Sequence, residues 1–340
     1  MLTLTTHASR ALPVFALLSC ISAQAAIPAS EVQALTNLYN ATNGASWTNS
    51  TNWLTAGAEC TWYGVTCDGN ETHVAGLALP SNQLAGALSD LSALTALQTL
   101  DLSNSLLTGS FPSLSSSGLH PFSIRVNDNQ LSGPLAANLN SLAFGSLYAQ
   151  NNELTGALPS FPFGGMYHLD LHNNQFTGSI PNWNGTIWVD IDLSSNQLEG
   201  SVPSLASLQS LQAFHIAHNQ LSGAPPELPT NSVVGVYDIS YNAFTGSLPV
   251  LPNANSSVLP LVAFTVDHNE LSGPVPDIQD TVLWDYKESL LCPNHLDPHT
   301  TTQIGFDWAA ATNQPWIPLE GKRASWYQGC DDWIFVQGFQ

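Results

Sequence analysis

Short alternations of apolar and polar residues recur along most of the chain at a nearly constant spacing. The unit around Asn196 shows the pattern: Ile191 and Leu193 lie five and three positions before the Asn, and Gly200 lies four positions after it. Apolar residues two positions apart are typical of a short strand with one buried face. A Gly at a fixed offset supplies the backbone freedom that a turn needs. The pattern therefore predicts one short strand and one tight turn in every unit.

The unit occurs nine times along the chain. Successive Asn positions are 22 to 24 residues apart, except for a last gap of 27 residues, which predicts an insertion around 252–261. In the second unit Ser105 replaces the Asn. An Asn side chain has two donor hydrogens and one acceptor oxygen, so it can satisfy backbone groups at a buried bend. The predicted ladder of stacked side chains consists of Asn82, Asn129, Asn152, Asn174, Asn196, Asn219, Asn242 and Asn269.

The repeat resembles the plant-type leucine-rich repeat, whose consensus is LxxLxxLxLxxNxLxGxIP. Residues 108–112 (Thr-Gly-Ser-Phe-Pro) and 177–181 (Thr-Gly-Ser-Ile-Pro) are close copies of the end of this consensus. The resemblance covers residues 75–285 and implies a right-handed α/β solenoid of about nine repeats. It also implies a parallel sheet on a concave face, with irregular or 3₁₀ segments on the back.

A stack of repeats needs a cover at each end. Val32, Leu35, Leu38 and Tyr39 have helical spacing, and residues 60–67 (Cys-Thr-Trp-Tyr-Gly-Val-Thr-Cys) resemble the CxWxGVxC signature of the plant-type N-terminal cap. Five Trp residues from position 284 onward predict a C-terminal cap. The expected segments are a signal peptide at 1–25, an N-terminal cap at 26–74, repeats at 75–285 and a C-terminal cap at 286–340.

The signal peptide is predicted from Arg10, an apolar run at 11–18 and Ala-Gln-Ala at 23–25. We therefore expect a secreted, extracellular protein. Lipoprotein anchoring through Cys20 is the alternative interpretation. No later segment has 18 unbroken apolar residues, so the sequence predicts no membrane-spanning helix.

Four cysteines follow the signal peptide, and an even count in an exported chain suggests two disulfides. Because the cysteines lie in pairs at opposite ends of the repeats, one arrangement is favoured among the three that are possible. The favoured bonds are Cys60–Cys67 and Cys292–Cys330. A zinc site that combines the two C-terminal cysteines with His295 and His299 is the alternative, and export favours the disulfide.

Charge is sparse and strongly acidic, with 5 Lys and Arg residues against 25 Asp and Glu residues and a net charge of −20. Such a surface repels nucleic acid and anionic membranes. The hydrolase, zinc-protease and phosphate-loop motifs are absent, and the repeated Gly residues follow the repeat period. The sequence therefore predicts a protein that is not an enzyme, that needs no cofactor and that is a monomer.

A solenoid of this kind places the residues four, two and one positions before each ladder position on the solvent side of the sheet. The early units carry mostly small or amide residues at these positions, whereas Asp, His and Tyr dominate from the fifth unit onward. Tyr167, His168 and Trp188 could extend this patch. The candidate ligand-binding residues are Tyr148, Asp170, His172, Asp192, His215, His218, Asp238, Tyr241, Asp267 and His268.

Three interpretations of the patch remain: a surface that binds a protein or glycan, an incidental polar face, and a divalent metal site. No pair of ligands has a recognisable metal spacing, so we predict no metal. The resemblance implies a recognition module for a protein or cell-wall polysaccharide. A structural or adhesion spacer and an inhibitor of polysaccharide-degrading enzymes are the alternatives. Some solenoids of this family bind ice, but the predicted solvent-facing columns contain only Thr265, not the flat Thr arrays that ice binding favours.

Overall fold

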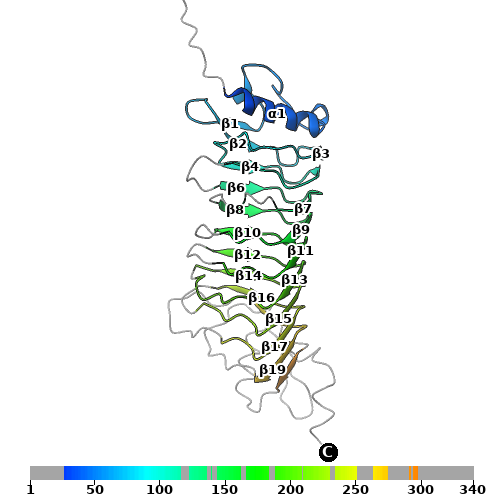
Figure 1. The fold of residues 1–340 in the computed structure, drawn as a ribbon, viewed down its shortest axis with the longest axis vertical. Helices are drawn as coiled ribbons and strands as arrows, with labels where there is room; N and C mark the ends of the chain where they lie inside the picture. The colour runs from blue at the N-terminus through cyan, green and yellow to red at the C-terminus, as the bar shows by residue number, and fades with distance from the viewer. Residues whose placement is uncertain are drawn as a thin grey trace, which may run out of the picture.

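In the computed structural model, the chain forms an elongated stack of coils with a helical cap at its N-terminal end (Figure 1). The structure describes residues 27–115, 122–135, 139, 144–161, 166–183, 188–208, 210–229, 234–250, 263–274, 291 and 294–297. The predicted signal peptide, the insertion around 252–261, and the cysteines Cys20, Cys292 and Cys330 lie outside these residues, as does His299.

One side of each described repeat unit from Asn82 to Asn269 contributes a short strand to a ten-stranded sheet, called here the first sheet. Strand β1 pairs antiparallel with β2, and the other nine strands pair in parallel in the order of the coils. The parallel sheet that the resemblance to leucine-rich repeats implied is therefore present. Its strands are β1 (Val65–Cys67), β2 (Val74–Ala78), β4 (Thr99–Asp101), β6 (Phe122–Arg125), β8 (Phe144–Tyr148), β10 (His168–Asp170), β12 (Asp190–Asp192), β14 (Ala213–His215), β16 (Val236–Asp238) and β18 (Ala263–Thr265).

A second side of the coils is also β structure, which was not predicted from the sequence. Residues that follow each ladder position pair with the next coil, because their backbone groups find partners there; the N–H of Ser132, for example, donates to the carbonyl of Gly109 at 2.8 Å. The described coils contain no α-helix, so this part of the chain is a β-solenoid. The second sheet contains β7 (Ser132–Pro134), β9 (Glu153–Ala157), β11 (Gln175–Gly178), β13 (Gln197–Gly200), β15 (Gln220–Gly223), β17 (Ala243–Gly246), β19 (Glu270–Pro274) and β20 (His295–Asp297), and β3 (Ala85–Ala87) pairs separately with β5 (Leu106–Thr108).

The Asn side chains join successive coils through hydrogen bonds to the backbone. The Oδ1 atom of Asn196 accepts the N–H of Phe176 in the preceding coil at 3.0 Å. Its Nδ2 group lies 3.0 to 3.2 Å from three carbonyls, those of Leu171, Leu193 and Ser194. The same arrangement recurs at the other Asn positions from Asn129 to Asn269, so each side chain satisfies buried backbone groups of two coils.

Two positions depart from this arrangement, and one further position adopts it. Asn82 contacts the cap instead, and its side chain bonds the backbone N–H and carbonyl of Asn49 at 2.7 and 2.9 Å. The hydroxyl oxygen of Ser105 is buried without a hydrogen-bond partner. Asn294, which the sequence analysis missed, accepts the N–H of Leu271 and acts as a further ladder residue. The ladder therefore continues past Asn269.

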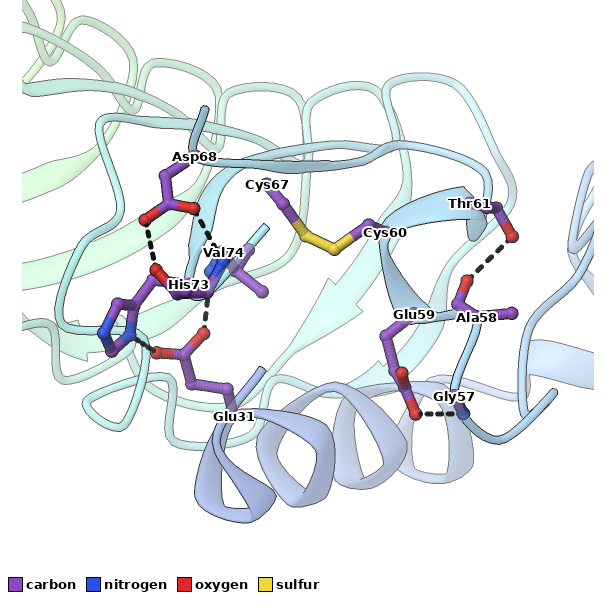
Figure 2. The surroundings of a disulfide bond; sticks show 11 residues. Glu31, Gly57, Ala58, Glu59, Cys60, Thr61, Cys67, Asp68, His73 and Val74 are labelled. Carbon is purple, nitrogen blue, oxygen red and sulfur yellow. Dashed lines mark hydrogen bonds and ion pairs between the residues drawn. A yellow bond between two sulfur atoms is a disulfide. The ribbon is translucent and has the colours of Figure 1, made fainter. Parts of the chain in front are cut away.

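The N-terminal cap consists of helix α1 (Ala29–Ala41), the 3₁₀ turns η1 (Gly44–Ser46) and η2 (Glu59–Thr61), and strand β1. Leu35 and Leu38 on α1 are fully buried, as their helical spacing predicted. Trp47, Trp53 and Trp62 pack with ring centroids 4.8 and 4.9 Å apart, and each indole N–H donates to a backbone carbonyl. The predicted disulfide between the cysteines at 60 and 67 joins η2 to β1 (Figure 2).

A buried carboxylate fastens α1 to the first parallel strand (Figure 2). Glu31 is only 1% exposed; its Oε1 lies 2.6 Å from Nδ1 of His73, and its Oε2 accepts the N–H of Val74 at 2.7 Å. The hydrogen bond to Glu31 raises the pKa of His73 above its usual value of 6.5. Protonated His73 therefore holds the cap more firmly than neutral His73.

We expect a pH-dependent contribution of His73 to the thermal stability of the protein. Because the pKa of His73 is higher in the folded state, its stabilising effect is complete below about pH 6.5 and disappears as the pH rises through the folded value. Thermal unfolding curves between pH 5.5 and 9, compared for the native chain and His73→Gln, measure this difference. The gap between the two melting temperatures should be wider at acidic pH; a constant gap would contradict the assignment.

Candidate ligand-binding surface

Three Asp side chains on the solvent side of the first sheet are held by donors of their own coil. In each case the Asp lies four positions before the ladder residue and a Ser lies two positions later. The Asp Oδ1 accepts the Ser N–H at 2.9 to 3.1 Å and the Ser hydroxyl at 2.6 to 2.7 Å. The pairs are Asp101 with Ser103, Asp192 with Ser194, and Asp238 with Ser240. This bonding fixes the orientation of each carboxylate and directs its second oxygen to other partners.

Asp170 and Asp192 lie directly opposite each other on β10 and β12, with His172 beside them. The Nδ1 atom of His172 lies 2.7 Å from Oδ1 of Asp170 and 3.5 Å from Oδ2 of Asp192. The hydrogen bond to Asp170 raises the pKa of His172, and the charges of Asp170, Asp192 and Asp128 add to the rise. Opposed carboxylates destabilise neighbouring strands, so an imidazolium at this position stabilises the pair.

The same three side chains offer the geometry of a small cation site. One atom from each of Asp170, His172 and Asp192 lies within 4.8 Å of the others. Imidazole nitrogen and carboxylate oxygen are ligands that divalent metals accept. No metal spacing is apparent along the sequence, because Asp170 and His172 belong to one coil and Asp192 belongs to the next.

A second set of charges adjoins this group. His168 Nδ1 lies 3.7 Å from Oδ2 of Asp190 on the neighbouring strand, and His215 is the register partner of Asp192. Burial raises the pKa of Asp190, while the charges of His215 and His168 oppose that rise. We call His168, Asp170, His172, Asp190, Asp192 and His215 the central cluster.

Aromatic and basic side chains border the central cluster on the side of the early coils. The ring of Tyr148 stacks against that of His168 with centroids 6.0 Å apart, and the guanidinium of Arg125 lies 4.0 Å from the centre of the Tyr148 ring. Tyr148 was a predicted site residue, whereas the contact with Arg125 was not foreseen. The border therefore holds the Arg125 guanidinium over the Tyr148 ring beside the acidic cluster.

The residue immediately before each ladder position has a left-handed backbone conformation in all nine units, with φ between 52° and 56°. The early units place Ser, Asn or Asp there, which tolerate this conformation. The last three units place His218, Tyr241 and His268 there, although bulky residues are disfavoured at positive φ.

These three rings form a stack that we call the aromatic column. Centroids are 4.1 Å apart between His218 and Tyr241 and 3.9 Å apart between Tyr241 and His268, with interplanar angles of 14° and 11°. The ring faces therefore cover one another along the solenoid, and the ring edges face outward. Such a column offers hydrogen-bonding edges to a ligand rather than an apolar platform.

Two of the sequence predictions for this surface are wrong. Asp267 was expected to face solvent but is only 2% exposed, and its Oδ2 lies 2.6 Å from Nδ1 of His268; burial raises the pKa of the Asp267 carboxyl. Short side chains two positions before a ladder residue can be buried, because longer neighbouring side chains bond to them. Ser240, for example, is buried and donates its hydroxyl to Asp238. Trp188 was expected to extend the patch but is fully buried and packs against Trp183 at 5.1 Å.

The predicted site residues fall into two groups. Asp170, His172, Asp192 and His215 meet in the central cluster, with Tyr148 and Asp238 on the strands beside it. The other group is the aromatic column. Sequence reasoning missed Asp190, although one further step of the strand alternation from Asp192 would have placed it on the same face.

The comparisons with known proteins agree with this architecture. A family model described as "Leucine rich repeat N-terminal domain" matches residues 28–68, and one described as "Leucine Rich Repeat" matches residues 96–117 and 166–186. The first match lies inside the predicted N-terminal cap, and the other two lie inside the predicted repeats.

Two solved structures share the fold. The ectodomain of the plant membrane receptor kinase GASSHO1/SCHENGEN3 from Arabidopsis thaliana, in complex with CASPARIAN STRIP INTEGRITY FACTOR 2, has a TM-score of 0.51 and 26% identity over 63% of this chain and 27% of that chain. A plant ice-binding protein has a TM-score of 0.50 and 22% identity over 81% of this chain and 99% of that chain. The present chain thus matches about a quarter of the receptor ectodomain.

Within the described residues, no helix combines the length and apolar character needed to cross a membrane. The cap signature, the Asn ladder and the two family models lead to one conclusion: the chain contains a leucine-rich repeat N-terminal domain at residues 28–68 and leucine-rich repeats that include residues 96–117 and 166–186.

Proposed function

We propose that this leucine-rich repeat protein is an extracellular recognition module that binds a protein or a cell-wall glycan through the solvent side of the first sheet. The likeness to a receptor ectodomain that was solved with a bound partner supports an extracellular binding role. The role proposed for the chain is binding and not catalysis.

The observation that carries the proposal is the uneven distribution of fixed polar groups along the sheet. Charged and aromatic side chains concentrate on the coils from β8 to β18, and several are held by hydrogen bonds within their own coil. A spacer needs a solvated surface, but it does not need preorganised carboxylates or rings at unfavourable backbone positions. Preorganisation reduces the entropy lost on binding, so it favours the recognition role.

Ice binding is less well supported as a second function. The likeness to the plant ice-binding protein is a likeness of fold. On the second sheet, Thr177 pairs with Gln197 and Thr245 pairs with Glu270, so Thr side chains do not lie next to one another. An unbroken Thr array is therefore lacking on the described part of this sheet, as it is on the first.

A binding screen with a paired variant tests the proposal. The purified protein is screened against secreted proteins and cell-wall polysaccharides, and each hit is repeated with a double variant, His215→Ala with Asp238→Asn. We expect binding to be lost at an unchanged melting temperature, because Asn can still accept the hydrogen bonds from Ser240.

Asp101→Asn is the matched control for this screen, since Asp101 has the same bonds to a Ser but lies near the N-terminal cap. The control should bind as the native chain does. A hit that binds the double variant with native affinity would show that the ligand site lies elsewhere on the molecule.

A further inference from the structure

The N-terminal cap exposes no charged side chain. Residues 29–67, all of which the structure describes, include two charged side chains, Glu31 and Glu59, and these are buried, at 1% and 8% exposure. The exposed side chains of the cap are mainly Thr, Asn, Ser and Ala. The whole chain, by contrast, has a net charge of −20, and carboxylates recur along the coils that follow, as at Asp101 and Asp192. The cap is therefore the uncharged end of an acidic solenoid (Figure 1).

Two large apolar side chains are exposed on this uncharged end. Leu54 is 48% exposed and Tyr63 is 41% exposed. They belong to two segments that hydrogen bonds hold side by side. The N–H of Tyr63 donates to the carbonyl of Thr51 at 3.0 Å, and the indole N–H of Trp53 donates to the carbonyl of Tyr63 at 2.9 Å. The pair leaves apolar area in water, which favours a contact that covers it.

The backbone at Leu54 is strained without a local reason. Its φ of 66° lies in the left-handed region, which is unfavourable for Leu. Asn52, two residues earlier, has a φ of 65°, but Asn tolerates this conformation. Burial does not offset the strain, because about half of the Leu54 side chain is exposed. Strain of this kind is common where a side chain is held for a contact with another molecule.

We propose that the cap is a self-association surface, on which Leu54 and Tyr63 of one chain pack against the same two residues of a second copy. Two chains that each have a net charge of −20 repel one another when their coils approach. Contact between two caps places no charged side chain of the cap against another. It also keeps the acidic coils apart, because each solenoid extends away from its cap (Figure 1).

The absence of charge on the cap selects this occupant over others. A basic partner would be attracted to the carboxylates of the coils instead of the cap. A second copy presents an uncharged surface of the same kind, and the same patch on both copies gives a closed two-fold interface. The proposal replaces the monomer expected from the sequence, and it does not depend on which ligand the first sheet binds.

Such a dimer has a consequence for the proposed recognition role. Two chains joined at their caps carry two first sheets in one particle. A ligand with repeated sites, such as a polymer on a surface, would therefore be held more tightly by the dimer than by a single chain, through the raised effective concentration of the second sheet.

Sedimentation velocity of the purified full chain tests the inference. Over a series from about 1 to about 200 μM at physiological salt, we expect monomer at the lower end and a particle of twice the mass at the upper end. Leu54→Asn should remain monomeric at every concentration, and it should stay folded because Asn tolerates the left-handed conformation. Tyr63→Thr should also weaken the dimer. Circular dichroism checks that both variants are folded.

Leu106→Asn is the matched control. Leu106 is 55% exposed, but it lies on β5, outside the cap, so its replacement should leave the dimer unchanged. Added salt should not dissociate the dimer, because the contact contains no ion pair and salt screens the repulsion between the chains. A native chain that stays monomeric at about 200 μM, a folded Leu54→Asn variant that still dimerises, or an equal loss in Leu106→Asn would overturn the inference.

Discussion

Replacing Asn196 with Ala is expected to lower the free energy of unfolding by about 3 kcal/mol. The substitution removes the acceptor for the buried N–H of Phe176 and the donor shared by the carbonyls of Leu171, Leu193 and Ser194. Water cannot replace these contacts easily, because Asn196 is only 9% exposed between two coils. Urea unfolding at equilibrium, followed by circular dichroism, measures the change.

The second repeat unit allows a matched substitution that should raise the free energy of unfolding instead of lowering it. Ser105 occupies a ladder position, and its hydroxyl oxygen is buried without a partner. An Asn at this position could reach the backbone of two coils as Asn129 does. Ser105→Asn should therefore stabilise the protein by about 1 kcal/mol. A ladder that only fills space would instead make Asn196→Ala mild and Ser105→Asn neutral.

Gly64→Ala is expected to destabilise the protein by at least about 3 kcal/mol. Gly64 has a φ of +80°, and a Cβ built there would overlap the carbonyl oxygen of Ala78. That oxygen belongs to the backbone at the end of β2, and the N–H of the same residue donates to Gly64 O at 2.7 Å. No side-chain rotation relieves such an overlap, so the cap must shift away from the first coil.

Gly178→Ala measures the cost of backbone strain without the steric overlap that Gly64→Ala introduces. Gly178 has a φ of +77°, close to that of Gly64, but a Cβ there meets no atom within 4 Å. Its cost should be about 1 kcal/mol, from the left-handed conformation alone. Melting temperatures of the two variants measure the difference, and equal shifts would mean that contact with the cap is unimportant.

The residue types on the first sheet explain why binding is assigned to its later coils. The early coils place Ser or Asn at the left-handed position, which is the choice with the least backbone strain. His218, Tyr241 and His268 accept that strain and gain ring stacking with exposed edges. Strain that local structure does not require is common at functional sites, and here it adjoins the central cluster.

The sequence by itself determined the solenoid, the strand in each unit and the ladder of Asn side chains. These features depend on residue types at fixed offsets within one unit, as Ile191, Leu193 and Asn196 show, and the repeat shows the same offsets nine times. The cap disulfide could also be predicted from the sequence, because Cys60 and Cys67 are close in the chain. Local periodicity was therefore sufficient to predict the fold.

Only the tertiary structure decided which polar residues meet. Asp170 and Asp192 become neighbours because their coils stack in register, and Asp190 approaches His168 for the same reason. Burial also depends on stacking, so Asp267 and Trp188, which looked exposed in the repeat pattern, lie inside. Contacts between coils depend on register, rotamer and the size of neighbouring side chains, and none of these is a property of a single repeat.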